Sequence, residues 1–262
     1  MFTFVSEMKH FILSILLSSV LMLAEKPAYS QRSLVDSAAF VTLIYATYQY
    51  QFPGGDMVNR FGVNSNIGGG ISIKNKSNWI FGLEGGYIFG DVVKGGDNLF
   101  SGIATSDGNL IDGNGILAEI HLYERGYHFQ FKAGKIFPIF GSNPNSGLLI
   151  QAGAGFLEHK IRIENPENTA PQIKADYKKG YDKLSNGLLL DETIGYIYMG
   201  KRRLTNFFIG FEFMQAFTKS RRDYDFNLQG KDNSSRTDIL SGIRVSWIIP
   251  LYNRGQTHYY IN

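Results

Sequence analysis

The sequence contains no cysteine, which excludes disulfide bonds, cysteine-ligated metal sites and cysteine nucleophiles. Charged residues make up only 19% of the chain, the net charge is +3, and no basic stripe indicates a nucleic-acid partner. Proline is sparse at 7 residues, whereas glycine is abundant at 30 of 262. Because glycine weakens a helix by up to about 1 kcal/mol per residue, this composition disfavours a helical bundle.

Only one part of the chain carries a long apolar run, and it lies near the N-terminus. A lysine precedes the apolar stretch 11–24, and a small-x-small site, 28–30, comes before Gln31. This order is typical of a secretory signal peptide. A membrane anchor is the alternative, but the run is too short to span a bilayer comfortably. We therefore predict a signal peptide over 1–30, Sec export, and an exported chain without a transmembrane helix.

Beyond the predicted signal peptide, the residue pattern repeats with a period of two, which indicates β-strands. In 79–90, bulky residues alternate with glycines and Glu84, and in 206–217 a row of phenylalanines alternates with Gly210 and Glu212. Eight segments show this pattern strongly: 38–50, 62–74, 79–90, 127–139, 147–164, 187–199, 206–226 and 236–252.

The connections between these segments alternate in length. Three are short turns and four are longer links: 75–78, 140–147 and 200–206, and 51–61, 91–126, 165–186 and 227–235. Outer-membrane barrels have short periplasmic turns and longer extracellular loops. The sequence therefore predicts an all-β protein, a closed antiparallel transmembrane β-barrel over 31–252, followed by a C-terminal tail, 253–262.

One segment complicates the strand count. Residues 116–126 also resemble a strand, and counting them gives nine, an odd number that does not fit the usual bacterial barrel. It would also put the loop 165–186 on the periplasmic side. We therefore place 116–123 inside the second long loop, as a strand extension or a small hairpin, and expect eight strands. Ten strands, with one more segment, is the alternative.

The two faces of the strands differ in kind. A soluble sandwich or a lipocalin-like periplasmic barrel would show the same alternation with its apolar face inside. Export, the aromatic loading of one face and the glycine enrichment of the other favour a membrane barrel with aromatic residues toward lipid. The predicted lipid face includes Phe81, Tyr87, Phe207, Phe211, Phe213 and Trp247. The predicted inward glycines are Gly82, Gly86, Gly134, Gly153, Gly210 and Gly242.

Four charged residues fall on the predicted inward face: Glu84, Lys132, Glu212 and Arg244. Charges removed from water need partners, and Glu212 and Arg244 lie on adjacent strands, close enough to pair. An ion pathway or gate is one interpretation. The interior of an eight-stranded barrel is, however, just wide enough for side chains to fill it. We therefore predict a structural, salt-bridged lumen that does not conduct.

A histidine pair is the next candidate. If Lys132 pairs with Gly155, His128 falls opposite His159 near the outer rim, with Glu158 beside it. Two histidines and a carboxylate suit a metal ion or general-base catalysis. No serine is obviously placed as a nucleophile, and rim histidines are usually just solvated. We therefore predict no catalytic, cofactor or metal site.

Two basic stretches flank the predicted outer rim. The loop 177–187 carries three lysines and two tyrosines, and 219–223 reads KSRRD. The loop 177–187 suits contact with lipopolysaccharide phosphates or a protein partner, and a solvated loop is its plainer interpretation. The stretch 219–223 lies near the outer rim, where anionic lipid head groups are found. Neither 219–223 nor the basic turn 201–204 has the aromatic interleaving of a nucleic-acid platform. We expect outer-membrane lipids as partners, and no nucleic acid.

The signal peptide, the eight segments and the last strand "RVSWIIPLY" resemble the small OmpA-like outer-membrane β-barrels of Gram-negative bacteria. The Ser-Gln junction and the blocks "PNSGLLIQAGAGFLEHKIRIE", "GYDKLSNGLLL" and "FEFMQAFTKSRRDYDF" resemble barrels of the Bacteroidota. The resemblance covers nearly all of 36–252. It departs at the end, where ten residues follow the aromatic Tyr252 and no peptidoglycan-binding domain follows.

This resemblance implies a location in the cell outer membrane and a non-enzymatic, structural or accessory role. Contacts of the outer rim and loops with other outer-membrane proteins would then carry the function, for example in a subunit of an export or protein-assembly complex. A porin-like small-solute pore is the first alternative, and a lipid-modifying barrel enzyme is the second.

Overall fold

The computed structural model describes residues 38–140, 143–200 and 204–251 of the chain. The predicted signal peptide, 1–30, and the predicted tail, 253–262, lie outside the described residues. Within the described part of the chain, no helix is long and apolar enough to cross a membrane.

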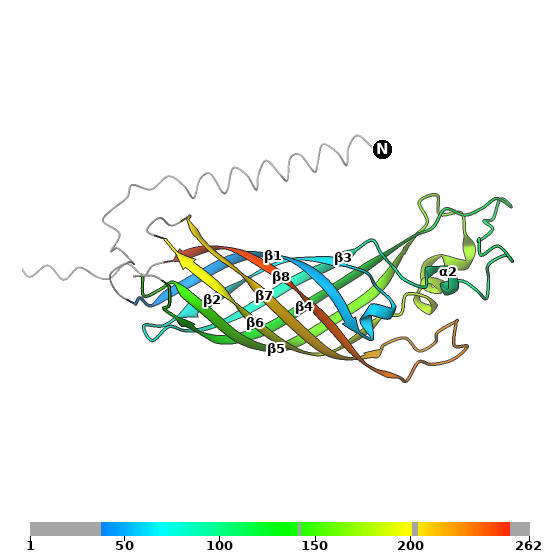
Figure 1. Ribbon diagram of the computed structural model, residues 1–262. Coiled ribbons are helices and arrows are strands. Elements are labelled where there is room, and N and C mark those ends of the chain that lie inside the picture. The colour runs from blue at the N-terminus through cyan, green and yellow to red at the C-terminus, as the bar shows by residue number, and fades with distance from the viewer. Residues whose placement is uncertain (1–37, 141–142, 201–203, 252–262) are drawn as a thin grey trace, which may run out of the picture. The chain divides into compact units, whose positions relative to one another are not determined.

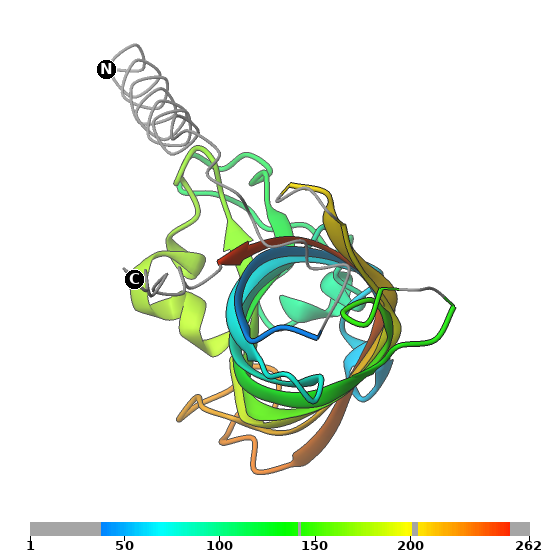
Figure 2. The ribbon, with the colours of Figure 1, turned by 90° about the vertical axis from the view of Figure 1, so that its left-hand side faces the viewer.

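Eight antiparallel strands form one closed barrel, so the predicted fold class is confirmed and the ten-strand alternative is wrong. Each strand pairs with its neighbour in sequence, and β8 pairs with β1 to close the ring, which Figure 2 shows along the barrel. The strands in Figure 1 are β1 (Val41–Gly55), β2 (Asn64–Lys74), β3 (Trp79–Gly90), β4 (His121–Phe137), β5 (Gly147–Glu164), β6 (Ser185–Met199), β7 (Asn206–Ser220) and β8 (Ser235–Leu251).

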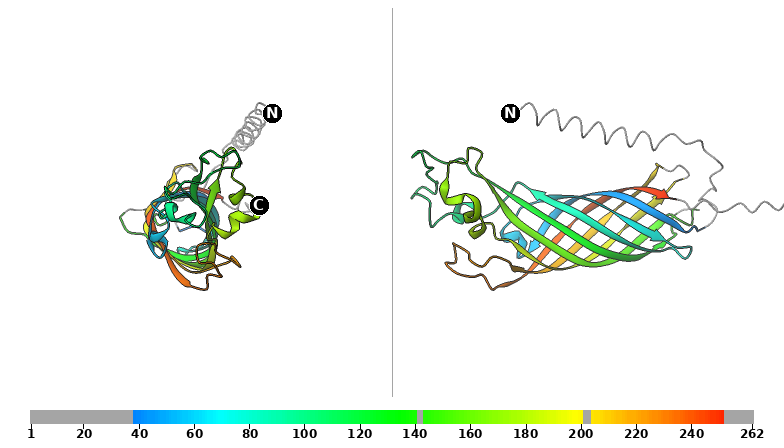
Figure 3. Two further views of the ribbon diagram at one scale, coloured as in Figure 1. Left: turned by 90° about the vertical axis from the view of Figure 1, so that its right-hand side faces the viewer. Right: turned by 180° about the vertical axis from the view of Figure 1, so that it is seen from behind.

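The two ends of the barrel differ in the length of their connections. One end, the short-turn end, carries the links 75–78, 138–146 and 200–205, and the other, the long-loop end, carries 56–63, 91–120, 165–184 and 221–234. The long-loop end gathers at the right of Figure 1 and is seen from behind in Figure 3. Its loops hold the short helices η1 (Met57–Asn59), α2 (Gly96–Leu99), η2 (Pro171–Ile173) and η3 (Ala175–Gly180).

The ambiguous segment 116–126 is divided between a loop and a strand. Ile111 and Leu117 form an isolated antiparallel bridge, and the Ala118 N–H donates to the Leu110 carbonyl at 2.8 Å, so 110–118 is a small hairpin. From His121 onward the chain belongs to β4, which stays paired with β5 as far as Glu164. Both predicted forms, hairpin and strand extension, are therefore present.

The predicted strand 206–226 was too long. β7 ends at Ser220, which faces Ser185, the first residue of β6. Beyond that point β7 has no β6 residue with which to continue the ladder. The residues after Ser220 therefore leave the barrel and enter the loop 221–234.

The predicted facing of the strands is confirmed. In β7, Phe211 is 46% exposed on the outer surface, whereas its neighbour Glu212 is 2% exposed inside. All six aromatic residues predicted on the lipid face lie on this outer surface. Water-soluble monomers rarely expose apolar patches larger than a few hundred Å², and here the aromatic and aliphatic side chains continue from strand to strand.

Inward glycines make room for the long side chains that fill the lumen. A Cβ on Gly86 would clash with the His128 ring and the Asn66 amide. A Cβ on Gly153 would lie 3.2 Å from the Lys132 side chain and 3.3 Å from that of Asp191. The glycine enrichment of this face therefore reflects the narrow interior.

Two apolar clusters lie on either side of the polar centre of the lumen. The cluster near the short-turn end contains Val41, Leu43, Ile80, Ile136, Leu149, Ile197, Met199, Phe208 and Ile248. At the long-loop end, loop residues pack onto inward strand residues, and we call this cluster the cap. Its loop members include Met57, Phe61, Leu99, Phe100, Leu110, Ala170, Ile173 and Tyr181.

Candidate functional site in the lumen and the cap

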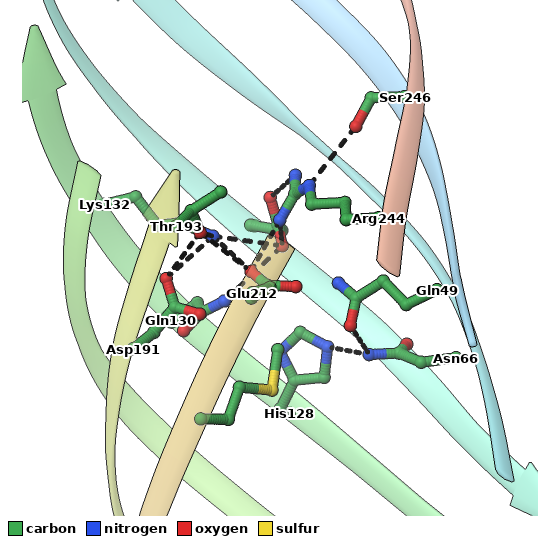
Figure 4. A network of polar contacts seen from close by, with 12 residues as sticks. Gln49, Asn66, His128, Gln130, Lys132, Asp191, Thr193, Glu212, Arg244 and Ser246 are labelled. Atoms are coloured by element: carbon green, nitrogen blue, oxygen red, sulfur yellow. Dashed lines mark hydrogen bonds and ion pairs between the residues drawn. The ribbon is translucent and has the colours of Figure 1, made fainter. Parts of the chain in front are cut away.

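Arg244 on β8 links two opposite walls of the barrel. Its Nη1 and Nη2 atoms lie 2.7 Å and 2.5 Å from the two carboxylate oxygens of Glu84 on β3. The same Nη1 donates to Oε1 of Glu212 on β7 at 2.7 Å, so the predicted pair of Glu212 and Arg244 is present. The rings of Tyr45 and Phe208 each lie 5.9 Å from the guanidinium carbon. This geometry fixes the guanidinium group in the centre of the lumen, where Figure 4 shows it.

Lys132 on β4 extends the network across the lumen. Its Nζ lies 2.5 Å from Glu212 Oε1, 2.8 Å from Asp191 Oδ1 and 2.8 Å from Thr193 Oγ1. A longer contact of 3.9 Å joins it to Glu84. The four residues predicted as a lumen cluster therefore belong to one network that connects β3, β4, β7 and β8.

Sequence reasoning missed two members of this network, Asp191 and Thr193 on β6. The signal was available, because alternation in 187–199 puts both on the face that also carries Gly195. Asp191 binds Lys132, and the Thr193 hydroxyl lies 3.2 Å from Oδ1 of Asp191 and 3.2 Å from Oε1 of Glu212. The charged residues thus number two cations against three carboxylates.

The charged side chains of this network are almost completely removed from solvent. The side chains of its five charged residues are at most 4% exposed. Removing one partner from a buried ion pair costs about 3–5 kcal/mol, because the other charge is left uncompensated. The arrangement cross-links the strands and fills the middle of the barrel.

The predicted histidine pair was wrong because the register differs by two residues. Lys132 faces Gly153 in the β4–β5 ladder, so His128 faces Leu157 and His159 faces Gly126. Glu158 points to the outer surface, where its carboxylate accepts a 2.9 Å hydrogen bond from Asn186. Among the described residues, no three His, Cys, Asp or Glu side chains gather in a way that could hold a metal ion.

The two histidines occupy separate places inside the barrel. His128 Nε2 lies 2.9 Å from the Asn66 amide nitrogen, which also donates to Gln49 at 3.3 Å (Figure 4). His159 Nε2 lies 2.8 Å from Asp238 on β8, nearer the cap. Each is thus a buried member of a polar chain, not a solvated rim residue as the sequence suggested.

Ser185, His159 and Asp238 are residue types of a hydrolase triad, and the surroundings argue against that use. All three residues lie inside the barrel beneath the cap, and each is no more than 1% exposed. The Ser185 hydroxyl donates to the Lys183 carbonyl at 3.0 Å and accepts from Arg60 at 3.2 Å. A serine held this way is not aimed at His159 as a nucleophile must be.

No protein-family model matches this chain. No curated protein matches it either. Among solved structures it is similar to Ail, the attachment invasion locus protein of Yersinia pestis, with 8% identity and a TM-score of 0.41 over 80% of this chain and 99% of Ail. It is also similar to the N-terminal β-barrel domain of Pseudomonas aeruginosa OprF, with 10% identity and a TM-score of 0.37 over 80% and 100% of the two chains.

A third similar structure is the outer membrane protein OprG of Pseudomonas aeruginosa, with 13% identity and a TM-score of 0.37 over 82% of this chain and 98% of OprG. The fold assignment stands on the strand pairing of this chain, and none of these structures supplies a residue role. The expected likeness to Bacteroidota barrels finds no support among them.

The basic loop 177–187 is less available than its sequence suggested. Tyr181 packs in the cap, 5.2 Å from the Phe100 ring and 4.9 Å from the Phe226 ring, and burial raises its pKa. Lys183 pairs with Asp225 at 2.5 Å and Lys179 pairs with its neighbour Asp176 at 2.6 Å. Tyr181 and Lys183 therefore attach this loop to the cap and to the loop 221–234, and Lys179 pairs within the loop itself.

Proposed function

We propose that the chain is a small OmpA-like β-barrel of the outer membrane of a Gram-negative bacterium, one that conducts no solute and acts through contacts at its outer rim and long loops. Its role is then structural or accessory, for example as a subunit of an outer-membrane export or protein-assembly complex. The observation that carries the proposal is the lumen, which is filled from the short-turn end to the cap.

The outer surface supports membrane insertion. Every strand carries large apolar side chains on its outer face that are 36–57% exposed to solvent in the isolated barrel. A bilayer would cover this band, and a closed barrel leaves no strand edge that needs hydrogen bonds from lipid. The apolar run and small-x-small site at the N-terminus of the sequence agree with export.

Three successive layers support the absence of conduction. An apolar cluster fills the short-turn end, the ion network crosses the centre, and the cap closes the long-loop end. A solute would have to break buried ion pairs and then displace the cap. A small-solute pore would need a rearrangement of both.

The long loops support a contact function. Their buried side chains build the cap, and this leaves Ile116 and Leu117 exposed in the 110–118 hairpin, at 57% and 63%. Two adjacent aliphatic side chains on a loop that reaches past the barrel suit a protein partner, which would remove them from water.

A comparison of two leucines tests the contact function. Leu117 in the hairpin is 63% exposed and Leu204 at the short-turn end is 62% exposed, so the two residues are matched in type and exposure. We expect Leu117→Asn to lose a partner that co-purifies from detergent-solubilised outer membranes, and Leu204→Asn to keep it. Equal recovery with both variants would show that the hairpin is not the contact.

Planar-bilayer recording tests the closed lumen separately. The purified protein should give no stable, large open currents, because the ion network and the cap block the path. Such currents from the wild type would overturn the closed-lumen proposal and favour the small-solute pore.

A further inference from the structure

Cations gather on one part of the outer surface, where the apolar band of β4 and β5 ends. Along β4 toward the long-loop end, the outward residues change from Phe129 and Tyr127 to Arg125. Along β5 they change from Phe156 through Glu158 to Lys160 and Arg162. If the band marks the depth of the bilayer, as the proposed function assumes, these cations lie at the level of the lipid head groups.

Two of these cations stand directly opposite each other. Arg125 and Lys160 are register partners in the β4–β5 ladder, and like charges in that position are unfavourable. Among the described residues neither has a carboxylate partner: Arg125 donates to the Gly90 and Glu124 carbonyls and lies over the Tyr123 ring. The strand pair therefore holds two unneutralised charges side by side.

The loop after β5 turns this surface into a groove of about 540 Å³. The Ile161 N–H donates to the Asp182 carbonyl at 2.7 Å, which holds the loop along β5. Lys178 on that loop donates to the Ile163 carbonyl at 3.1 Å and lines the groove together with Arg125 and Lys160. We call this feature the β4–β5 groove.

Two carboxylates also line the groove. Asp182 is paired with Arg222, whose Nε donates to it at 2.8 Å, whereas Glu158 accepts a hydrogen bond from the neutral amide of Asn186 and keeps its charge. Of the four cations in the groove, only Arg162 has a carboxylate partner among the described residues, Glu164 at 2.5 Å. The three other cations, Arg125, Lys160 and Lys178, outnumber the single charge of Glu158 and remain able to meet an anion.

We propose that the β4–β5 groove binds the phosphomonoester head group of a lipid in the outer leaflet. A phosphomonoester presents three acceptor oxygens and close to two negative charges, which suits a cluster of guanidinium and ammonium donors. Its acyl chains would run down the outer surface over Tyr127, Phe129 and Phe156. The bound lipid relieves the repulsion between Arg125 and Lys160 and covers the aromatic side chains below them.

Native mass spectrometry of the purified full-length protein in detergent tests this site, with phosphatidic acid as the probe. We expect wild type to retain phosphatidic acid more tightly than phosphatidylglycerol or phosphatidylcholine. Lys160→Gln and Arg125→Gln should each weaken retention about fivefold, the weight that one basic residue carries at an anionic membrane surface. The two substitutions together should abolish the preference for phosphatidic acid.

Lys219 provides the matched control. It is an exposed lysine on β7 and, like Lys160, the first outward cation beyond the last outward aromatic residue of its strand. Lys219→Gln should retain phosphatidic acid as wild type does. If Lys219→Gln and Lys160→Gln lose phosphatidic acid equally, the lipid is held by a general attraction to the charged rim and not by the groove. That result would overturn the proposal.

Two further outcomes would also contradict a phosphomonoester site in the β4–β5 groove. Equal retention of phosphatidic acid and phosphatidylglycerol would remove the phosphomonoester preference, and displacement of the lipid by inorganic phosphate would identify a free-phosphate site instead. Membrane insertion is measured independently, by folding wild type and each variant into phosphatidylcholine vesicles. A chain that folds into vesicles but shows no lipid preference contradicts the groove alone, whereas failure to insert contradicts the proposed function.

Discussion

Asp191 and Glu192 are neighbours in β6 and lie on opposite faces of the barrel wall. Asp191 is 2% exposed in the lumen, with the Lys132 ammonium group 2.8 Å away. Glu192 lies halfway along the outer face of the strand, with Leu190 and Ile194 on either side. Its register partners are Ala152 and Phe213. Within the described part of the chain, Glu192 has no cation beside it.

The difference shows how one strand meets two environments. Inside, a carboxylate is tolerated because two cations and a threonine hydroxyl surround it and its neighbours. Outside, the same chemical group faces the layer that a bilayer would occupy, where a charge is unfavourable. Replacing a carboxylate by an apolar residue should therefore have opposite effects on the free energy of unfolding at the two faces. Three predictions test this difference, from the largest expected change in stability to the smallest.

The largest effect should come from breaking the lumen network. Arg244→Met removes the group that joins Glu84 to Glu212 and should lower the free energy of unfolding by about 3–5 kcal/mol, because the carboxylates lose their main partner. Urea unfolding in lipid vesicles, followed by the fluorescence of Trp79 and Trp247, measures this loss. Ser246→Ala is the control, since Ser246 lies on the same face and makes only a 3.3 Å hydrogen bond to Arg244. An Arg244→Met variant as stable as wild type would mean that the lumen is hydrated and the network adds little.

An intermediate loss is expected on the outer face. Phe211→Arg places a cation in the apolar band and should cost about 2–4 kcal/mol near the bilayer midplane. Phe211→Leu keeps the site apolar and serves as the control in the same vesicle unfolding experiment. If both variants insert and unfold alike, the outer face of β7 does not contact lipid.

The smallest effect should be a gain. Glu192→Leu should raise the free energy of unfolding in vesicles by up to about 2 kcal/mol, since an acidic residue costs less than a cation on this face. Asp191→Leu, one residue away, should instead destabilise, because Lys132 loses a partner inside. A loss of stability in both variants would show that Glu192 makes a favourable contact that the isolated barrel lacks.

Much of the fold could be predicted because alternation is a local property of the chain. The row of phenylalanines in β7 against Gly210 and Glu212 defined the two faces, and the alternation of short turns and long loops predicted that the two ends of the barrel differ. The same rule predicted the four inward charges, Glu84, Lys132, Glu212 and Arg244. Residues two apart in a strand share a face, and this holds whichever strand lies beside it.

The wrong predictions concerned contacts between segments, which the residue pattern of one strand does not specify. The β4–β5 register was misjudged by two residues, which preserves the facing of every side chain but moves His128 from opposite His159 to opposite Leu157. Tyr181 and its lysine neighbours were interpreted as a free basic loop, although Phe100 and Phe226, distant in sequence, cover the tyrosine.

The sequence by itself determined which residues face the lumen and which face outward, because the strand period of two depends only on the backbone. Apart from the pair of Glu212 and Arg244 on adjacent strands, tertiary structure alone decided which inward charges meet, because closure of the ring brings β3, β4, β6, β7 and β8 around one narrow space. It also decided that the long loops pack over one end of the barrel, since the cap is built from residues that pack only when 56–63, 91–120 and 165–184 converge. Contacts of this kind depend on the distances between strands and loops, which alternation along one strand does not specify.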